Sequence, residues 1–202
     1  LSSKWFYDSI GDSLFIRIMN LPEYYLTKSE EEIFAKKTYQ ILSSLVPDSG
    51  EFDLFELGAG DGSKTMHLLT ALKTRKFTYR PIDISSNSID NLQKRVAEEL
   101  PSIEVEGMQG EYFEVLAKLT TGRPKIILFM GSNIGNMLDE RANEFLLKLS
   151  AVMEVGDRLL LGVDLIKDES VILPAYNDSE GVTAEFNLNL LDRINRELGG
   201  DF

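Results

Sequence analysis

Short apolar runs alternate with amphipathic stretches through the middle of the chain, and this alternation constrains its fold more than any other feature. The runs have the length of strands, and the stretches between them have helical spacing. The expected strands are 52–57, 77–84, 103–108, 125–130 and 158–165, and the expected helices are 63–73, 88–100, 112–119 and 139–153. This order predicts a doubly wound, mostly parallel α/β sheet.

The two ends of the chain do not continue the alternation. Residues 28–46 predict an amphipathic helix, with Thr27 or Ser29 as the N-cap and three glutamates at its positive end. Residues 182–198 predict a second amphipathic helix. Its expected inward residues are Val182, Phe186, Leu190, Leu191 and Ile194. We expect the flanks to join into a second layer or a cap over the edge of the sheet.

Composition excludes several classes of function. The net charge is −12 and the pI is about 4.6, so nucleic acid and anionic membranes are not expected partners. Because the chain has no cysteine and one histidine, His67, we expect no disulfide, no thiol nucleophile and no metal site. The sequence contains no signal peptide and no long apolar run, which favours a cytoplasmic protein. Its start at Leu1 and its end at Phe202 suggest a piece of a longer protein.

A glycine-rich turn, 56-ELGAGDGSKT-65, follows the first expected strand and precedes a helix. Glycines in such a turn let backbone N–H groups approach a ligand near the helix N-terminus. The dinucleotide pattern G-x-G-x-x-G is not met, because Gly62 stands one place early. The E-x-G-x-G-x-G form resembles the nucleoside-binding turn of Rossmann-like, S-adenosylmethionine-dependent methyltransferases.

Two acidic positions follow in the order that such a fold requires. Asp83 ends the second strand, where a carboxylate can accept hydrogen bonds from both ribose hydroxyls. In such enzymes the segment 110-GEY-112 is where adenine is held, with Glu111 at the amino group and Tyr112 over the ring face. After the fourth strand, 131-GSNIGN-136 places Asn133 and Asn136 at the ligand crevice, although asparagines among glycines also serve turns.

Several segments together resemble one family, the histidine-specific, S-adenosylmethionine-dependent methyltransferases that trimethylate the α-amine of L-histidine in ergothioneine synthesis. The matching segments are 4-KWFYDSIGDSLF-15, 21-LPEYY-25, 56-ELGAGDGSKT-65, 131-GSNIGN-136, 162-GVDLIKD-168 and 176-YNDSEGVTAEFNLNLLDRINRELGGDF-202. The resemblance implies a Rossmann-like cofactor domain at 51–167. It also implies a substrate domain begun by 1–50 and continued by an insertion from 168, cut short at 202.

The resemblance also implies roles for individual residues. Tyr7 would lie beside the substrate amine, and Tyr24 would hydrogen-bond the imidazole. Asn136 and Tyr176 would hold the carboxylate, and Gly131 and Phe15 would line the same pocket. The residues assigned to S-adenosylmethionine are Glu56, Gly58, Gly60, Lys64, Asp83, Glu111 and Tyr112.

This chain departs from the family pattern at some positions. Leu26 stands where proline is common, Asn133 where threonine is usual, and Glu111 where aspartate is usual. The family's imidazole-recognising carboxylate and hydroxyl come from sequence beyond the position of Phe202. A methyltransferase of another amino acid or small amine therefore stays open, as does a cofactor-binding module without turnover. A nicotinamide oxidoreductase is a poorer third reading.

Overall fold

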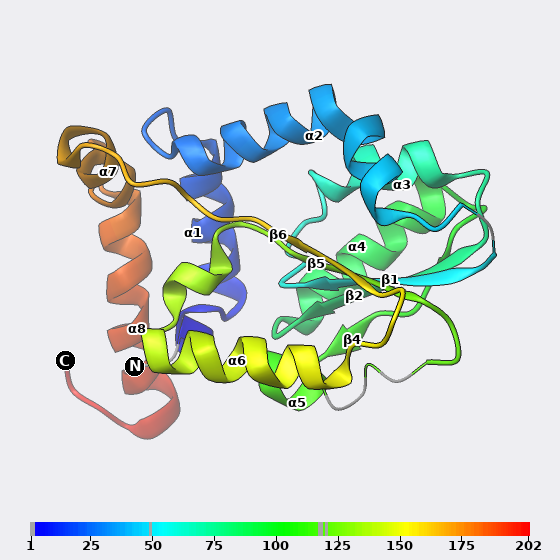
Figure 1. The fold of residues 1–202 in the computed structure, drawn as a ribbon. Helices are drawn as coiled ribbons and strands as arrows, with labels where there is room; N and C mark the ends of the chain where they lie inside the picture. Colours follow the sequence, from blue (N-terminus) through cyan, green and yellow to red (C-terminus); the bar gives the residue numbers. More distant parts are fainter. Residues whose placement is uncertain (1–2, 49, 117–118, 120) are drawn as a thin grey trace. The chain divides into compact units, whose positions relative to one another are not determined.

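The computed structural model describes residues 3–48, 50–116, 119 and 121–202, which form two compact units (Figure 1). The sheet unit is Glu30–Asp164, and the helical unit is Leu1–Ser29 together with Leu165–Phe202. The helix α2 (Tyr25–Leu45) belongs to both units, because the boundary falls within it. The helical unit also contains η1 (Ser3–Phe6), α1 (Ser9–Asn20), α7 (Glu169–Tyr176) and α8 (Val182–Leu198).

The sheet unit alternates strands and helices along the chain, as the sequence predicts. In order, its elements after α2 are β1 (Phe52–Leu57), α3 (Thr65–Leu72), β2 (Phe77–Asp83), α4 (Ser86–Glu99), β3 (Glu104–Val105), β4 (Met108–Gln109), α5 (Tyr112–Leu116), β5 (Lys125–Phe129), η2 (Asn133–Asn136), α6 (Asp139–Val152) and β6 (Arg158–Leu161). The strand order is β3-β2-β1-β5-β6, every pairing is parallel, and β4 also pairs with β2. This arrangement confirms the predicted doubly wound fold.

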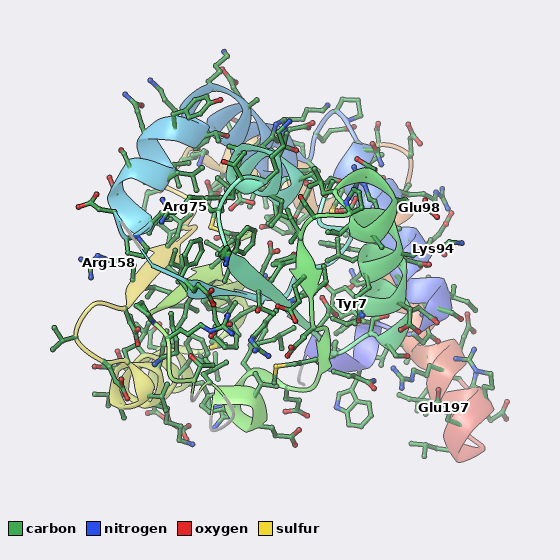
Figure 2. The ribbon with its side chains drawn as sticks, turned by 90° about the vertical axis from the view of Figure 1, so that its right-hand side faces the viewer. Tyr7, Arg75, Lys94, Glu98, Arg158 and Glu197 are labelled. Atoms are coloured by element: carbon green, nitrogen blue, oxygen red, sulfur yellow. The ribbon has the colours of Figure 1, made fainter. Side chains whose placement is uncertain are left out.

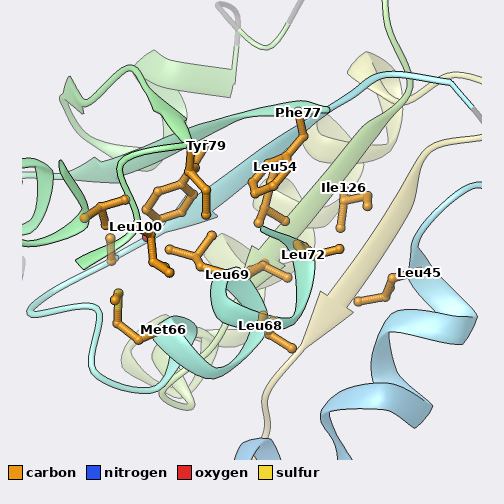
Figure 3. Packing of buried hydrophobic residues seen from close by; sticks show 14 of the residues in the cluster. Leu45, Leu54, Met66, Leu68, Leu69, Leu72, Phe77, Tyr79, Leu100 and Ile126 are labelled. Carbon is orange, nitrogen blue, oxygen red and sulfur yellow. The ribbon is translucent and has the colours of Figure 1, made fainter. Parts of the chain in front are cut away.

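Alternate residues of β1 face opposite layers, because side chains alternate across a strand. Phe52 and Leu54 face the cluster formed with α2, α3 and α4, part of which is drawn in Figure 3. Phe55 and Leu57 face the second cluster, formed with α5 and α6. Burying each of these large side chains contributes about 1.5–3 kcal/mol. Lys94 and Glu98 project from the exposed side of α4 (Figure 2).

In the helical unit, α1 and α8 pack against each other around a small apolar core (Figure 1). Asp8 joins the two helices. Its Oδ1 accepts a hydrogen bond from the Gly11 amide at 2.8 Å, which caps α1, and one from Asn189 Nδ2 at 2.9 Å. The Arg196 guanidinium contacts Asp8 Oδ2 at 2.5 Å. Segments from both ends of the chain thus form one unit.

Some local expectations were wrong. Thr27 and Ser29 do not cap α2, because the helix already begins at Tyr25. For the same reason the three glutamates do not stand at its start, and its first turn contains no acidic residue. The expected strand 103–108 is two short strands, and between them Gly107 lies so close to α4 that a Cβ would approach Gln93 and Ile89 within 2.5 Å. Leu191 is exposed, whereas the polar Asn189 is buried and donates to Asp8. The expected helix 112–119 ends at Leu116, and residues 117, 118 and 120 lie outside the described residues.

In the described part of the chain, no helix combines the length and apolar character needed to cross a membrane.

Candidate cofactor and substrate sites

Three neighbouring strands of the sheet unit end at the same level. Leu57 of β1 pairs with Ile82 of β2 on one side and with Phe129 of β5 on the other. The strand order reverses between β1 and β5, and open α/β sheets bind ligands at this point, beyond the carboxyl ends. The glycine-rich turn, Asp83 and the loop from Gly131 to Asn136 (the 131–136 loop) follow these ends.

Asp83 holds two of the predicted cofactor segments together. Its Oδ2 accepts the Gly60 amide at 2.9 Å, and its Oδ1 accepts the Ser85 amide at 3.0 Å. Its backbone carbonyl accepts the amide of Gly110, which begins the GEY segment, at 3.0 Å. Burial raises the pKa of the Asp83 carboxyl, and hydrogen bonds from Ser85 and Gly60 oppose that shift. The carboxylate is therefore held in one orientation at the carboxyl end of β2.

The glycines of the turn meet different surroundings. A Cβ on Gly58 would lie 2.7 Å from Tyr112 Oη and 2.9 Å from Asn133 Nδ2, so only glycine lets these polar groups approach. A Cβ on Gly62 would lie 2.3 Å from Leu92, which packs α4 on the turn. Gly60 has a φ of +55° and open space beside it. The turn is thus closely packed at Gly58 and Gly62 and has free space beside Gly60.

Glu56 lies beneath the turn and is buried, with 4% of its surface exposed. Its Oε1 accepts the Thr65 hydroxyl at 2.5 Å, and its Oε2 accepts the Tyr79 hydroxyl. Burial raises the pKa of the Glu56 carboxyl to about 7, against the opposing effect of these hydrogen bonds. Among the residues assigned to the cofactor, Glu56 is the one whose carboxylate faces the core, where it ties β1 and β2 to the start of α3.

Lys64, at the start of α3, is paired with a glutamate that the sequence did not single out. Its Nζ lies 2.5 Å from Glu30 Oε2, and the two side chains are 22% and 15% exposed. The other oxygen of Glu30 accepts the Gly131 amide at 2.8 Å. Glu30 looks like an ordinary acidic residue near a helix start, so no local pattern predicts these contacts.

Tyr112 and Asn133 lie side by side against Gly58 of the turn. The Tyr112 ring packs edge-on against Phe129 and Phe145, at centroid distances of 5.1 and 6.0 Å. Asn133 Nδ2 donates to the Met130 carbonyl at 2.8 Å and so closes the 131–136 loop. Glu111 directly precedes α5 and is partly buried, and Asn136 is exposed at the end of η2. Asn133 therefore serves the turn, and Asn136 presents its amide.

The residues that the resemblance assigns to the substrate divide between the units. Gly131 and Asn136 belong to the sheet unit, whereas Tyr7, Phe15, Tyr24 and Tyr176 belong to the helical unit. Those four form a continuous aromatic row, in which each ring meets the next edge-on. The centroid distances are 5.5 Å for Tyr7–Phe15, 6.3 Å for Phe15–Tyr24 and 6.1 Å for Tyr24–Tyr176. Figure 2 labels Tyr7.

Phe186 of α8 is a central ring that the sequence predicted only as an inward residue. It lies 5.6 Å from Tyr7 and 5.9 Å from Phe15 between centroids, so it backs the row. Tyr24 is 9% exposed and Tyr176 is 54% exposed, so the row runs from the core to the surface. Tyr25 packs against the core of the helical unit, with Lys167 Nζ 4.8 Å from its ring.

The loop before α8 is fixed by two carboxylates near the row. Asp178 accepts the amides of Val182 and Thr183, each at 2.8 Å. Burial acts to raise the pKa of Asp178, but hydrogen bonds from Thr183 and Val182 hold it at about 2. Glu23 accepts the Ser179 hydroxyl at 2.8 Å. These bonds tie the segment after Tyr176 to the segment before Tyr24, so the aromatic row has a rigid frame.

The parallel strand order, the glycine-rich turn and the acid at the end of β2 define a Rossmann-like class I S-adenosylmethionine-dependent methyltransferase fold. A solved structure of the carbon methyltransferase DszA has this fold in common with the chain, with a TM-score of 0.54 and 18% identity over 79% of this chain and 39% of that one. The model of the family "Histidine-specific methyltransferase, SAM-dependent" matches residues 1–202. The chain belongs to this family, which confirms the resemblance.

Curated relatives carry matching names. The chain is 40% identical to "Histidine N-alpha-methyltransferase" of Mycobacterium tuberculosis, over all of this chain and 62% of that protein. It is 34% identical to "Ergothioneine biosynthesis protein 1" of Neurospora crassa, over 96% of this chain and 22% of that protein. The chain thus spans less than two thirds of the length of either relative.

Proposed function

We propose that the protein transfers a methyl group from S-adenosylmethionine to the α-amine of an amino acid, and that the amino acid is L-histidine. The observation that carries the proposal is that the glycine-rich turn meets Tyr112 at Gly58 and Asp83 at Gly60, beside the reversal of strand order. Membership of the histidine-specific family and the name of the Mycobacterium tuberculosis relative support the choice of substrate. The name of the Neurospora crassa relative supports a place in ergothioneine synthesis.

The residues of the turn fit a nucleoside cofactor. There is open space beside Gly60, and the Asp83 carboxylate next to it can accept hydroxyl donors. We assign Asp83 to the ribose of the cofactor and Glu111 and Tyr112 to its adenine. Gly58, Gly60 and Lys64 are assigned to the rest of the cofactor. Glu56 supports the turn from below, through Thr65 and Tyr79. S-adenosylmethionine supplies an activated methyl group on a sulfonium.

The protein's task in such a transfer is alignment, which lowers the barrier by up to about 7–11 kcal/mol. The attacking amine must be unprotonated, and because a free α-amine has a pKa near 8, no strong base is required. Tyr7 would orient the amine lone pair, and its ring favours the cationic product. Asn136 and Tyr176 would hold the carboxylate, Tyr24 would hydrogen-bond the imidazole, and Gly131 and Phe15 would line the pocket.

The proposal is tested by incubating the protein with methyl-labelled S-adenosylmethionine and each amino acid in turn. We expect the label on L-histidine and none on α-N-acetyl-L-histidine. Acetylation delocalises the lone pair of the α-nitrogen into an amide, so that nitrogen is no longer nucleophilic, and it leaves the ring nitrogens unchanged. Label on another amino acid would identify the rival substrate. Cofactor binding without any transfer would indicate a binding module. Label on the acetylated control would move the reaction to the imidazole.

Replacing Tyr24 with phenylalanine is expected to raise the dissociation constant for L-histidine by about 5- to 10-fold, the effect of losing one hydrogen bond. The ring itself stays, so its edge-on packing on Phe15 and Tyr176 is retained. Calorimetric titration with each ligand measures the effect, and cofactor affinity should change less than twofold. Equal losses for both ligands would contradict this role, and Tyr39→Phe, at an exposed ring of α2, is the matched control.

A further inference from the structure

We propose that Glu30 is a positioning residue for the methyl transfer, acting on the cofactor through Lys64 and on the amino acid through the 131–136 loop. The inference rests on the proposed function and adds to it a residue that has no assigned role. Glu30 begins the part of α2 that belongs to the sheet unit. Its carboxylate reaches the carboxyl edge of the sheet and contacts three separate segments there.

The first segment is the start of α3. Lys64 Nζ lies 2.5 Å from Glu30 Oε2, and both side chains are largely buried. A lysine has a flexible four-carbon stem, so a partly desolvated carboxylate restricts where its ammonium can lie. The ammonium keeps further N–H donors for an anionic group of a ligand. Glu30 thus sets the position from which Lys64 meets the cofactor.

The second segment is the 131–136 loop. Glu30 Oε1 accepts the Gly131 amide at 2.8 Å. Gly131 has a φ of +71° and Ser132 one of +53°, so two successive residues hold a left-handed conformation, which for serine is unfavourable. Such a backbone persists only where its surroundings fix it. The bond from Glu30 fixes the first residue of the loop that ends at Asn136.

The third segment is the residue that follows β6. A Cβ on Gly162 would lie 2.6 Å from Glu30 Oε1, so glycine is required for the carboxylate to lie there. The Gly162 amide donates to the Phe129 carbonyl at 2.9 Å, which keeps the end of β6 beside β5. The Glu30 carboxylate is therefore held between Lys64 and the backbone at Gly131 and Gly162.

The two actions of Glu30 are separable by substitution. In Glu30→Gln the side-chain amide oxygen still accepts the Gly131 N–H, but the charge facing Lys64 is lost. In Glu30→Ala both contacts are lost. We therefore expect Glu30→Gln to affect the cofactor alone and Glu30→Ala to affect both ligands. Glu32→Gln is the matched control, because Glu32 lies two residues along the same helix and pairs only on the surface with Lys36.

Calorimetric titration with S-adenosylmethionine measures the action of Glu30 on cofactor binding. We expect Glu30→Gln to raise the dissociation constant about fivefold, as for loss of a partly buried ion pair, and Lys64→Met about tenfold. If Glu30 acts through Lys64, the dissociation constant of the double variant Glu30→Gln/Lys64→Met should match that of Lys64→Met within about twofold. Independent, additive effects, or an unchanged affinity in Glu30→Gln, would overturn the inference. A wild-type protein that does not bind the cofactor overturns the proposed function, and the inference with it.

Steady-state kinetics measures the action of Glu30 on the amino-acid substrate. We expect the KM for L-histidine to stay within about twofold of wild type in Glu30→Gln and to rise about tenfold in Glu30→Ala. Equal KM values in the two variants would overturn action through Gly131. Thermal unfolding of each variant separates misfolding from misplacement. If Glu30→Ala does not fold, the cycle between Glu30→Gln and Lys64→Met still decides whether Glu30 acts on the cofactor through Lys64, and an additive cycle overturns the inference.

Discussion

Replacing Asp83 with alanine is expected to raise the dissociation constant for S-adenosylmethionine by at least about 100-fold, because two charge-assisted hydrogen bonds to the ribose would be lost. The same change removes the acceptor for the Gly60 amide, so the turn loses the bond that joins it to β2. Calorimetric titration measures both affinities, and the affinity for L-histidine should fall far less. The change acts mainly on one ligand.

Two variants sharpen this test. Asp83→Asn keeps an acceptor oxygen for Gly60 and should lose about tenfold in affinity. Asp90→Ala removes an exposed carboxylate from α4, a few residues further along the chain, and should bind like the wild type. An unchanged affinity in Asp83→Ala would refute the assignment to the ribose. A loss in Asp90→Ala of similar size would show that the effect comes from net charge.

The stability contributed by Glu56 is expected to fall as the pH rises. The pKa of its carboxyl is about 7 in the folded protein, above the ordinary value of 4.5, so the folded state holds its proton more tightly than the unfolded state. The stabilisation is therefore fully present below about pH 4.5 and is lost as the pH rises through 7. From pH 5 to pH 8, this lowers the free energy of unfolding by about 2–3 kcal/mol.

Urea denaturation of the wild type and of Glu56→Gln at several pH values measures this loss. The glutamine does not titrate, and Asp83, whose pKa is also raised, is present in both proteins and cancels. The free energy of unfolding of the wild type should fall relative to that of Glu56→Gln as the pH rises. A difference that is constant from pH 5 to pH 8 would show that Glu56 has the same pKa in both states. Glu144→Gln, at an exposed carboxyl of α6, provides the control for charge removal.

Local sequence was enough to predict most of the sheet unit and the last helix of the helical unit. The bounds of β1 at 52–57 and of α8 at 182–198 agree with the prediction, because apolar periodicity over a whole element is a strong signal. The start of α2 was not predicted correctly. Several cap residues stood in a row there, and packing of Tyr24 and Leu26 into the core of the helical unit favoured an earlier start. The close approach of Gly107 to α4 was not predictable either, because a strand pattern does not contain the neighbouring helix.

The candidate site divides in the same way. The turn and Asp83 were predictable, since a backbone without Cβ and an acid at a strand end carry their own local signature. Glu56 was predicted at the cofactor, but whether a strand residue faces a ligand or the core depends on what packs above it. Here Thr65 and Tyr79 take both of its oxygens. The aromatic row was predictable residue by residue only through the family resemblance, and its backing by Phe186 was not predicted.

The sequence by itself determined the alternation of strands and helices, the glycine-rich turn and the family to which the chain belongs, because each of these is written in short segments. Only the tertiary structure decided which distant groups meet. Gly131 is 101 residues from Glu30, yet one carboxylate joins it to Lys64. Tyr7 and Phe186 come together because α1 and α8 pack side by side. Such contacts depend on the burial of whole elements, and periodicity within one element does not specify its partner.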